Sequence, residues 1–72
     1  MNPEELALRF TYHTPQGDQP ERYVAIRDAA RVLAESIVEK TPASREQSLA
    51  ITALEECVFW ANAAIARREG TD

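Results

Sequence analysis

The side chains of this 72-residue chain that could do chemistry are few. His13 is the one general base suited to neutral pH, and the single Cys, Cys57, lies far along the sequence in an apolar segment. One Cys excludes an intramolecular disulfide, and one His with one Cys argues against a zinc site. Two Gly are too few for a phosphate loop or a dinucleotide fingerprint. We therefore expect no enzyme, with no catalytic residue, metal or cofactor, and we interpret Cys57 as a small buried hydrophobe.

A binding site is better supported, because aromatic and Arg side chains recur at positions that a helical fold can bring together. An aromatic ring can stack on a nucleobase, and Arg can pair with a phosphate or stack on a base. In an antiparallel hairpin the end of the last helix returns to the loop that carries Tyr12. The candidate ligand-binding residues are Tyr12, His13, Gly17, Arg27, Arg31, Asn62, Arg67 and Arg68.

A purely structural role for several of these residues stays open on the sequence alone. Tyr12 could cap the core of the hairpin. Arg27 and Arg31 could pair with the neighbouring acidic residues Asp28 and Glu35. Surface ion pairs of this kind are common and contribute little to stability.

The charge balance excludes several classes of partner. Twelve acidic and eight basic residues give a net charge of −4, whereas DNA, RNA and membrane-surface binders normally carry a basic excess. The first residues have no basic and apolar regions of a signal peptide. No apolar run is expected to approach the roughly 20 residues of a membrane span. We expect a cytoplasmic protein with no DNA or membrane partner.

The start of the chain predicts a short helix over residues 3–10. Asn2 can cap it, Pro3 suits its first position, and Glu5 can reach back as in a capping box. Its apolar side consists of Leu6, Ala7 and Phe10. A helix this short must pack against something to be stable.

A loop separates this helix from a second one. In the loop, Gly17 allows a positive φ at little cost. Asp18 then caps a helix predicted over residues 19–40. Apolar side chains spaced three and four residues apart form a seam for a partner helix: Tyr23, Ile26, Ala30, Leu33 and Ile37.

A third helix is predicted over residues 44–68, with Ser44 and Gln47 as a capping box and Gly70 just beyond its end. Its own seam consists of Ile51, Leu54, Val58, Ala61 and Ile65. The short link at 41–43 makes the two long helices antiparallel neighbours. The fold class is therefore all-α: a single domain over residues 1–72, in which a short N-terminal helix precedes an antiparallel helical hairpin.

The third helix carries more apolar surface than one partner helix can cover. A second line lies beside its seam: Ala50, Ala53, Cys57, Trp60 and Ala64, with Leu49 and Phe59 outside both. Asn62 sits among these residues and needs a hydrogen-bond partner, such as one across a subunit boundary. Small domains often need oligomerisation for stability, so we expect a homo-oligomer with Trp60 in the core or at the interface. The alternative is a structural or adaptor hairpin that binds another protein through this face.

Five motifs follow one another along nearly the whole chain: RFTYH at 9–13, GDQPERY at 17–23, IRD at 26–28, SREQSLA at 44–50 and WANAAIAR at 60–67. Each motif alone is weak, but the ordered series is distinctive. It resembles the helical-hairpin family of small bacteriophage cyclic-nucleotide sponges, which inhibit bacterial immune signalling of the CBASS and Thoeris types.

The resemblance implies a non-enzymatic protein that sequesters cyclic dinucleotides and, in some members, cyclic trinucleotides or cyclic ADP-ribose isomers. It also implies a homo-oligomer, often a hexamer, with pockets shared between subunits. By position, Tyr12 corresponds to a ring that stacks on the ligand, and Arg27 to a basic residue of the same pocket. Arg67 or Arg68 corresponds to a phosphate contact in a second, trinucleotide-type pocket. Ala29 stands where some members have a hydroxyl, which weakens the case for trinucleotides.

Overall fold

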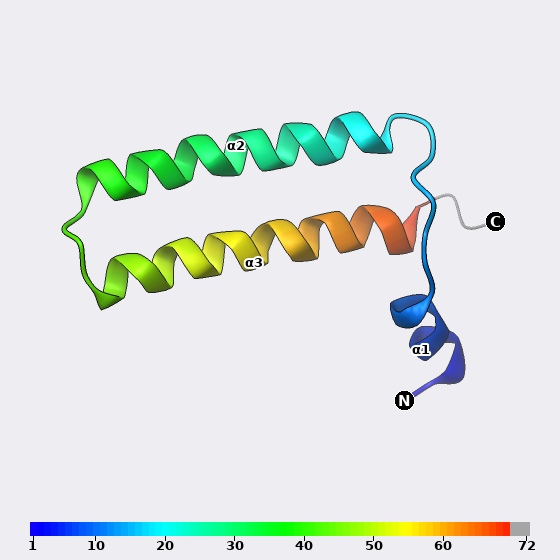
Figure 1. Cartoon of the computed structure of the whole chain (residues 1–72). Helices are drawn as coiled ribbons and strands as arrows, with labels where there is room; N and C mark the ends of the chain where they lie inside the picture. The colour runs from blue at the N-terminus through cyan, green and yellow to red at the C-terminus, as the bar shows by residue number, and fades with distance from the viewer. Residues whose placement is uncertain (70–72) are drawn as a thin grey trace.

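The computed structural model describes residues 1–69. They form three α-helices and no strand: α1 (Pro3–Phe10), α2 (Gln19–Lys40) and α3 (Arg45–Arg68). The all-α prediction is confirmed. Helices α2 and α3 lie side by side and antiparallel, and α1 lies beside the C-terminal end of α3 (Figure 1). The helix stop predicted at Gly70 lies outside the described residues.

Three local predictions about helix ends and turns are confirmed. The Asn2 side-chain oxygen accepts hydrogen bonds from two backbone N–H groups in the first turn of α1, at 2.6 and 3.3 Å. The Ser44 hydroxyl accepts one from the Gln47 N–H at 3.1 Å, so Ser44 is the N-cap and α3 begins one residue later than expected. Gly17 has a φ of 56°, the left-handed region in which a side chain would be strained.

Two predicted caps are wrong, because each carboxylate binds a guanidinium instead. Glu5 does not complete a capping box; it accepts hydrogen bonds from Arg9 at 2.9 Å and Arg68 at 3.0 Å. Asp18 occupies the N-cap position of α2 but makes no side-chain cap bond, and it pairs with Arg22 at 3.2 Å. A guanidinium carries a full positive charge and several N–H donors, so it attracts a carboxylate more strongly than a neutral backbone N–H group does.

Gln47 completes its capping box only in part. Its side-chain amide donates to the Val38 carbonyl at 3.3 Å, and to the Thr41 carbonyl and hydroxyl at 3.0 and 3.1 Å. These bonds run across the turn between α2 and α3. Gln47 therefore ties the closed end of the hairpin together in place of reaching back to Ser44.

The predicted seam of α3 is confirmed, and one of the five seam residues predicted on α2 is wrong. All five seam residues of α3 are half-buried or buried. On α2, Leu33 is 51% exposed, whereas Ala34 is half-buried and faces α3. A straight helix has 3.6 residues per turn and drifts away from a strict heptad, so the contact moves from Leu33 to Ala34.

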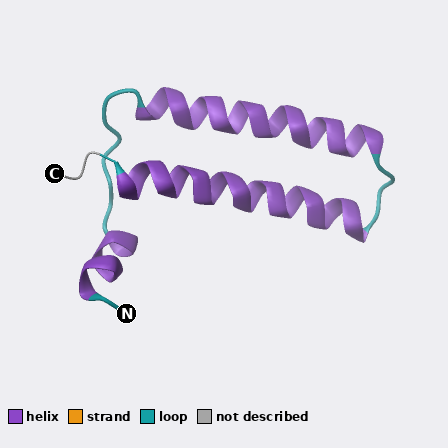
Figure 2. Cartoon of the chain, turned by 180° about the vertical axis from the view of Figure 1, so that it is seen from behind, coloured by secondary structure: helices purple, strands orange, loops and turns teal. Residues whose placement is uncertain are grey.

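The single chain is a flat, extended layer. Its solvent-accessible surface is 5674 Å², whereas a compact chain of this mass exposes about 4,500 Å². Its radius of gyration is 15.4 Å against about 11 Å for a compact domain, and its smallest dimension is 13 Å, about one helix diameter. Figure 2 shows this one-layer hairpin from behind. Globular domains are usually built from two packed layers, and the described residues supply one.

The apolar surplus of α3 lies uncovered, as its spacing predicts. Phe59 and Trp60 are 61% and 62% exposed, and Cys57 is exposed as well. The prediction of a buried Cys57 is therefore wrong for the single chain, and Trp60 is not part of its core. The reason is that α2 covers only the seam face of α3, and these residues lie outside it. Burial of this face against another copy remains a prediction.

Helix α3 also corrects the expectation that no apolar run approaches a membrane span. It is long and apolar enough to qualify by length and composition, with a mean hydropathy of 1.4 over an 18-residue window. Glu55 and Glu56 lie at the middle of the helix. A charge at a bilayer centre costs about 2.5–3.5 kcal/mol, so these carboxylates oppose insertion. The hydropathy reflects the same apolar surplus that predicts assembly.

The α1 helix is held by polar contacts and not by the apolar side that its sequence suggests. Leu6 and Phe10 are 48% and 83% exposed. Glu5 binds Arg68 of α3, and the Leu8 carbonyl accepts a hydrogen bond from His13. The apolar side expected for this helix therefore stays largely uncovered in the single chain, and α1 is supported by these polar contacts.

Candidate functional site

The candidate site is a hollow at the open end of the hairpin, where residues 11–18 pass the beginning of α2 and the end of α3 (Figure 1). It has a volume of about 470 Å³ and is open to solvent. We call it the Tyr12 hollow. It is lined by Arg9, Thr11, Tyr12, His13, Tyr23, Arg27, Phe59, Asn62, Ala63, Ala66 and Arg67.

The structure brings five of the eight candidate residues to this hollow: Tyr12, His13, Arg27, Asn62 and Arg67. The others lie elsewhere. Arg31 lines a neighbouring hollow of about 360 Å³ along the hairpin, Arg68 faces α1, and Gly17 shapes the turn before α2. Aromatic and Arg groups from distant parts of the sequence therefore meet at one end of the molecule.

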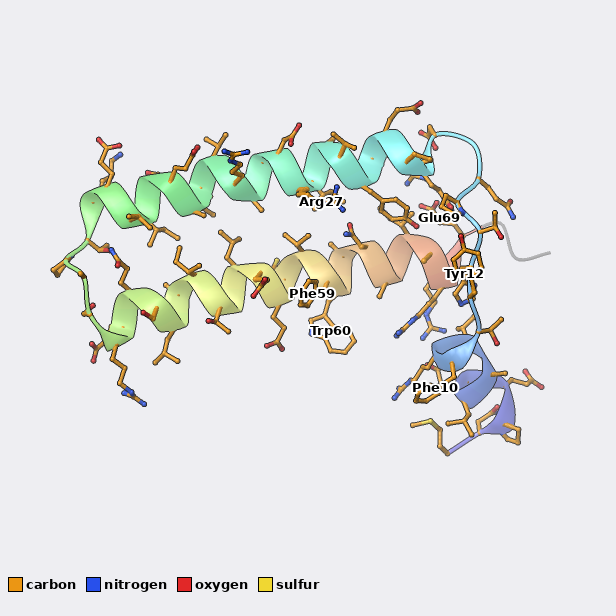
Figure 3. The ribbon with its side chains drawn as sticks, in the orientation of Figure 1. Phe10, Tyr12, Arg27, Phe59, Trp60 and Glu69 are labelled. Atoms are coloured by element: carbon orange, nitrogen blue, oxygen red, sulfur yellow. The ribbon has the colours of Figure 1, made fainter. Side chains whose placement is uncertain are left out.

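Tyr12 and His13 present different surfaces to the hollow. The Tyr12 side chain is 81% exposed, so it does not cap the hairpin core, and its ring faces are free to stack (Figure 3). His13 is half-buried, and its Nε2 lies 2.7 Å from the Leu8 carbonyl oxygen. Because a carbonyl only accepts, Nε2 carries the proton and donates it, which leaves Nδ1 of a neutral ring as an acceptor.

Arg27 and Arg31 differ although they share a helix face. Arg31 forms an ion pair with Glu35, Nε to Oε2 at 3.7 Å, with both side chains well exposed. The ion pair that the sequence offers as an alternative for Arg31 is therefore present. Within residues 1–69, Arg27 has no ion-pair partner, Asp28 included. Arg27 points from α2 towards α3 (Figure 3), and its charge remains available to a ligand.

Asn62 lines the hollow, and its side-chain oxygen lies buried behind the surface. Its Oδ1 atom is buried and has no hydrogen-bond partner among the described residues. A buried acceptor without a partner costs about 1–3 kcal/mol. A donor from a ligand or from another subunit would remove that cost, which agrees with the expectation that Asn62 needs a partner.

A second hollow lies on the other side of Arg67, between α1 and α3. It has a volume of about 450 Å³ and is lined by Glu5, Arg9, Phe10, Trp60, Ala63, Ala64, Arg67 and Arg68. The Arg68 guanidinium, followed by that of Arg9, lowers the pKa of the Glu5 carboxylate through hydrogen bonds. Trp60 donates its indole N–H to Glu56 at 3.2 Å. Arg68 thus forms an ion pair with Glu5 in the single chain.

A polar clamp that the sequence analysis missed closes the open end of the hairpin. Gln19, one of two buried side chains within residues 1–69, donates from Nε2 to the Ile65 carbonyl at 3.4 Å and to Glu69 at 3.2 Å. Its Oε1 accepts from the Gln16 N–H at 3.0 Å. One amide therefore joins the loop, the start of α2 and the end of α3.

Arg22 completes this clamp. Its Nη1 and Nη2 donate to the two Glu69 carboxylate oxygens at 2.7 and 2.6 Å. The Arg22 guanidinium, with a further contribution from the Gln19 amide, lowers the pKa of Glu69 to about 2, and Glu69 raises the pKa of Arg22. One signal was present in the sequence: a Glu after the last turn of a helix sits at the negative end of its dipole and requires a cation.

This arrangement defines a small helical-hairpin protein with a candidate binding site at the open end of the hairpin. The family model described as Acb2/Tad1, hairpin domain, matches residues 2–66. The chain belongs to this family, and the resemblance carried by its five motifs is confirmed. Searches of curated proteins and of solved structures found no match.

Proposed function

We propose that this protein is a non-enzymatic sponge that binds and sequesters cyclic oligonucleotide second messengers. Cyclic dinucleotides are the primary ligands, and cyclic trinucleotides or cyclic ADP-ribose isomers are secondary candidates. Sequestration in the cytoplasm of an infected bacterium would block antiphage immune signalling. Membership of the Acb2/Tad1 hairpin family supports this proposal.

The observation that carries the proposal is the charge of the Tyr12 hollow. Acidic residues outnumber basic ones in the chain, yet three Arg residues and no acidic residue are among those that line this hollow: Arg9, Arg27 and Arg67. Arg9 is paired with Glu5 at 2.9 Å, whereas Arg27 and Arg67 have no ion-pair partner within residues 1–69. Interactions between exposed charges are screened beyond about 8 Å at physiological salt, so the distant acidic residues do not outweigh the local Arg cluster. The hollow is suited to a small dianion.

The chemistry of a cyclic dinucleotide matches these groups. Its bases can stack on the exposed ring of Tyr12, and its phosphates can pair with the uncommitted Arg27. Asn62 lines the same hollow, and its buried Oδ1 atom could accept a hydrogen bond from an exocyclic amino group of a base only after its side chain turns towards the ligand. No step breaks a bond in the ligand, because binding alone removes the signal.

We also propose that the protein is a homo-oligomer, with a hexamer as the expected state. The flat single layer, its extra exposed surface and the apolar line that includes Trp60 support assembly. A twofold interface brings the same surface of two subunits together, so residues of both subunits can contribute to the pockets of the assembly.

Titration calorimetry with a panel of cyclic di- and trinucleotides tests the function. We expect tight binding of at least one cyclic dinucleotide. A panel that gives no binding heat, in a protein whose folding is verified by circular dichroism, contradicts the sponge proposal.

The adaptor alternative is favoured by one observation, the uncovered apolar face of α3 with Phe59 and Trp60. An adaptor would show no nucleotide affinity and would assemble only with its partner. Light scattering of the purified protein separates the two functions, because the sponge proposal requires a homo-oligomer without any other protein.

A further inference from the structure

Phe59 lies where two hollows of the hairpin meet. It lines the Tyr12 hollow, and it also lines the neighbouring hollow of about 360 Å³, which we call the Arg31 hollow. Arg27 lines both hollows as well. The two hollows therefore share one boundary, made by Arg27 of α2 and Phe59 of α3.

The exposure of Phe59 is not explained by the hairpin. Its side chain is 61% exposed, and it belongs neither to the seam of α3 nor to the second apolar line. Asn62 follows it three positions later on the helix, so the two side chains share a helix face. Both residues line the Tyr12 hollow.

The Arg31 hollow offers a surface suited to a flat ring. Apolar side chains of both long helices make most of its lining: Ala30, Ala34, Ile51, Leu54 and Val58. Two guanidinium groups, of Arg27 and Arg31, lie along its α2 side, and the Glu55 side chain lies on its α3 side. Since Arg31 is paired with Glu35, Arg27 is the cation available to a phosphate. A planar base placed there would contact these apolar side chains, and the neighbouring phosphate of the ligand would lie near a guanidinium group.

We propose that Phe59 is a second stacking platform for the same ligand, an inference that rests on the proposed function. One base of a cyclic dinucleotide stacks on Tyr12 and the other on Phe59, with a phosphate at Arg27 between the two hollows. Phe59 thereby selects ligands with two bases over ligands with one. This role is distinct from a contribution of Phe59 to assembly.

Three substitutions of Phe59 separate stacking from apolar burial. Phe59→Ala removes the ring, Phe59→Leu keeps apolar bulk without a π face, and Phe59→Tyr restores the face. Since base–aromatic stacking contributes about 1–3 kcal/mol per base, we expect the first two to weaken binding of cyclic di-AMP or cyclic di-GMP by about 5- to 140-fold. Phe59→Tyr should bind like the unchanged protein. Val32→Ala, an exposed apolar truncation outside both hollows, is the control.

The outcomes distinguish this inference from the function on which it rests. Failure of the unchanged protein to bind either cyclic dinucleotide overturns both. Binding by the unchanged protein that Phe59→Leu retains in full overturns only the stacking role. A change of oligomer mass in Phe59→Leu, measured by light scattering, also overturns it, because Phe59 would then act in assembly. A Phe59→Leu protein that binds the cyclic dinucleotide more weakly but keeps the oligomer mass of the unchanged protein supports the inference. Cyclic AMP has one base, so its weak binding should be the same in the unchanged protein and in Phe59→Leu.

Discussion

Arg22 and Glu69 form a two-pronged ion pair, with both guanidinium Nη atoms within 2.7 Å of the two carboxylate oxygens. The pair joins the first turn of α2 to the residue that follows α3, 47 positions apart. It closes the hairpin at the end where the Tyr12 loop passes. The position of the candidate site therefore depends on a polar contact and not on a buried core.

Loss of this contact should lower stability in a pH-dependent way. Glu69 has a folded-state pKa of about 2, below its ordinary value of 4.5, so its contribution is present above pH 4.5. The contribution is lost as the pH falls towards 2. We expect Glu69→Gln to melt several degrees below the unchanged protein at pH 7, and the difference to disappear between about pH 4.5 and 2. Thermal melts followed by circular dichroism measure this.

Glu39→Gln is the matched control for that experiment, because Glu39 is an exposed carboxylate of α2 outside the clamp. Its melting temperature should stay close to that of the unchanged protein at every pH. A Glu69→Gln protein that melts like the Glu39→Gln protein at pH 7 would show that the clamp does not stabilise the fold.

Tyr12→Ala should weaken binding of cyclic dinucleotides by about 1–3 kcal/mol, because it removes a ring that can stack on a base. Tyr12→Phe keeps the ring and should bind nearly as well as the unchanged protein. Calorimetry measures both affinities. Since Tyr12 is 81% exposed, neither change should lower the melting temperature. Equal affinity of Tyr12→Ala and Tyr12→Phe would remove Tyr12 from the site.

Arg27→Ala should weaken binding by about 1.5–3 kcal/mol, the usual contribution of a hydrogen bond to a charged group. Arg45→Ala removes the same charge at the opposite, closed end of the hairpin and serves as the control. Titrations at two salt concentrations should show a weaker salt dependence for Arg27→Ala than for Arg45→Ala. Identical losses in both variants would mean that only net charge matters.

The single Trp reports directly on assembly. Trp60 is 62% exposed in one chain, so it would emit at long wavelength as a monomer. We expect blue-shifted emission at micromolar concentration and a red shift on dilution. Ala53→Glu places a charge on the same apolar line and should produce the red-shifted state without dilution, whereas Val24→Glu on α2 should not. Long-wavelength emission of the unchanged protein at every concentration would contradict assembly through this face.

The sequence predicts the helices well, because their signals are local. The caps at Asn2 and Ser44 and the left-handed Gly17 depend only on neighbouring residues, and all three are confirmed. The wrong caps have a common cause: at Glu5 and Asp18, a nearby Arg competes successfully with the backbone for the carboxylate. Local patterns do not reveal which partner wins.

The candidate site is less accessible to sequence reasoning. The convergence of Tyr12, Arg27 and Arg67 follows from the antiparallel hairpin and was expected. The Gln19–Glu69 clamp joins residues from the two ends of the hairpin and leaves only a weak local signal. The sequence also does not show which Arg side chain forms an ion pair. Arg31 pairs with Glu35, whereas its helical neighbour Arg27 has no ion-pair partner in the described part of the chain.

The central claim is that the protein holds an intact cyclic nucleotide and does not convert it. The most direct measurement incubates the protein with a cyclic dinucleotide that it binds, removes free ligand, denatures the complex and analyses the released nucleotide by chromatography and mass spectrometry. Sequestration predicts that the bound nucleotide is recovered in full and unchanged. Linearised or otherwise modified nucleotide, accumulating with incubation time, would contradict the account.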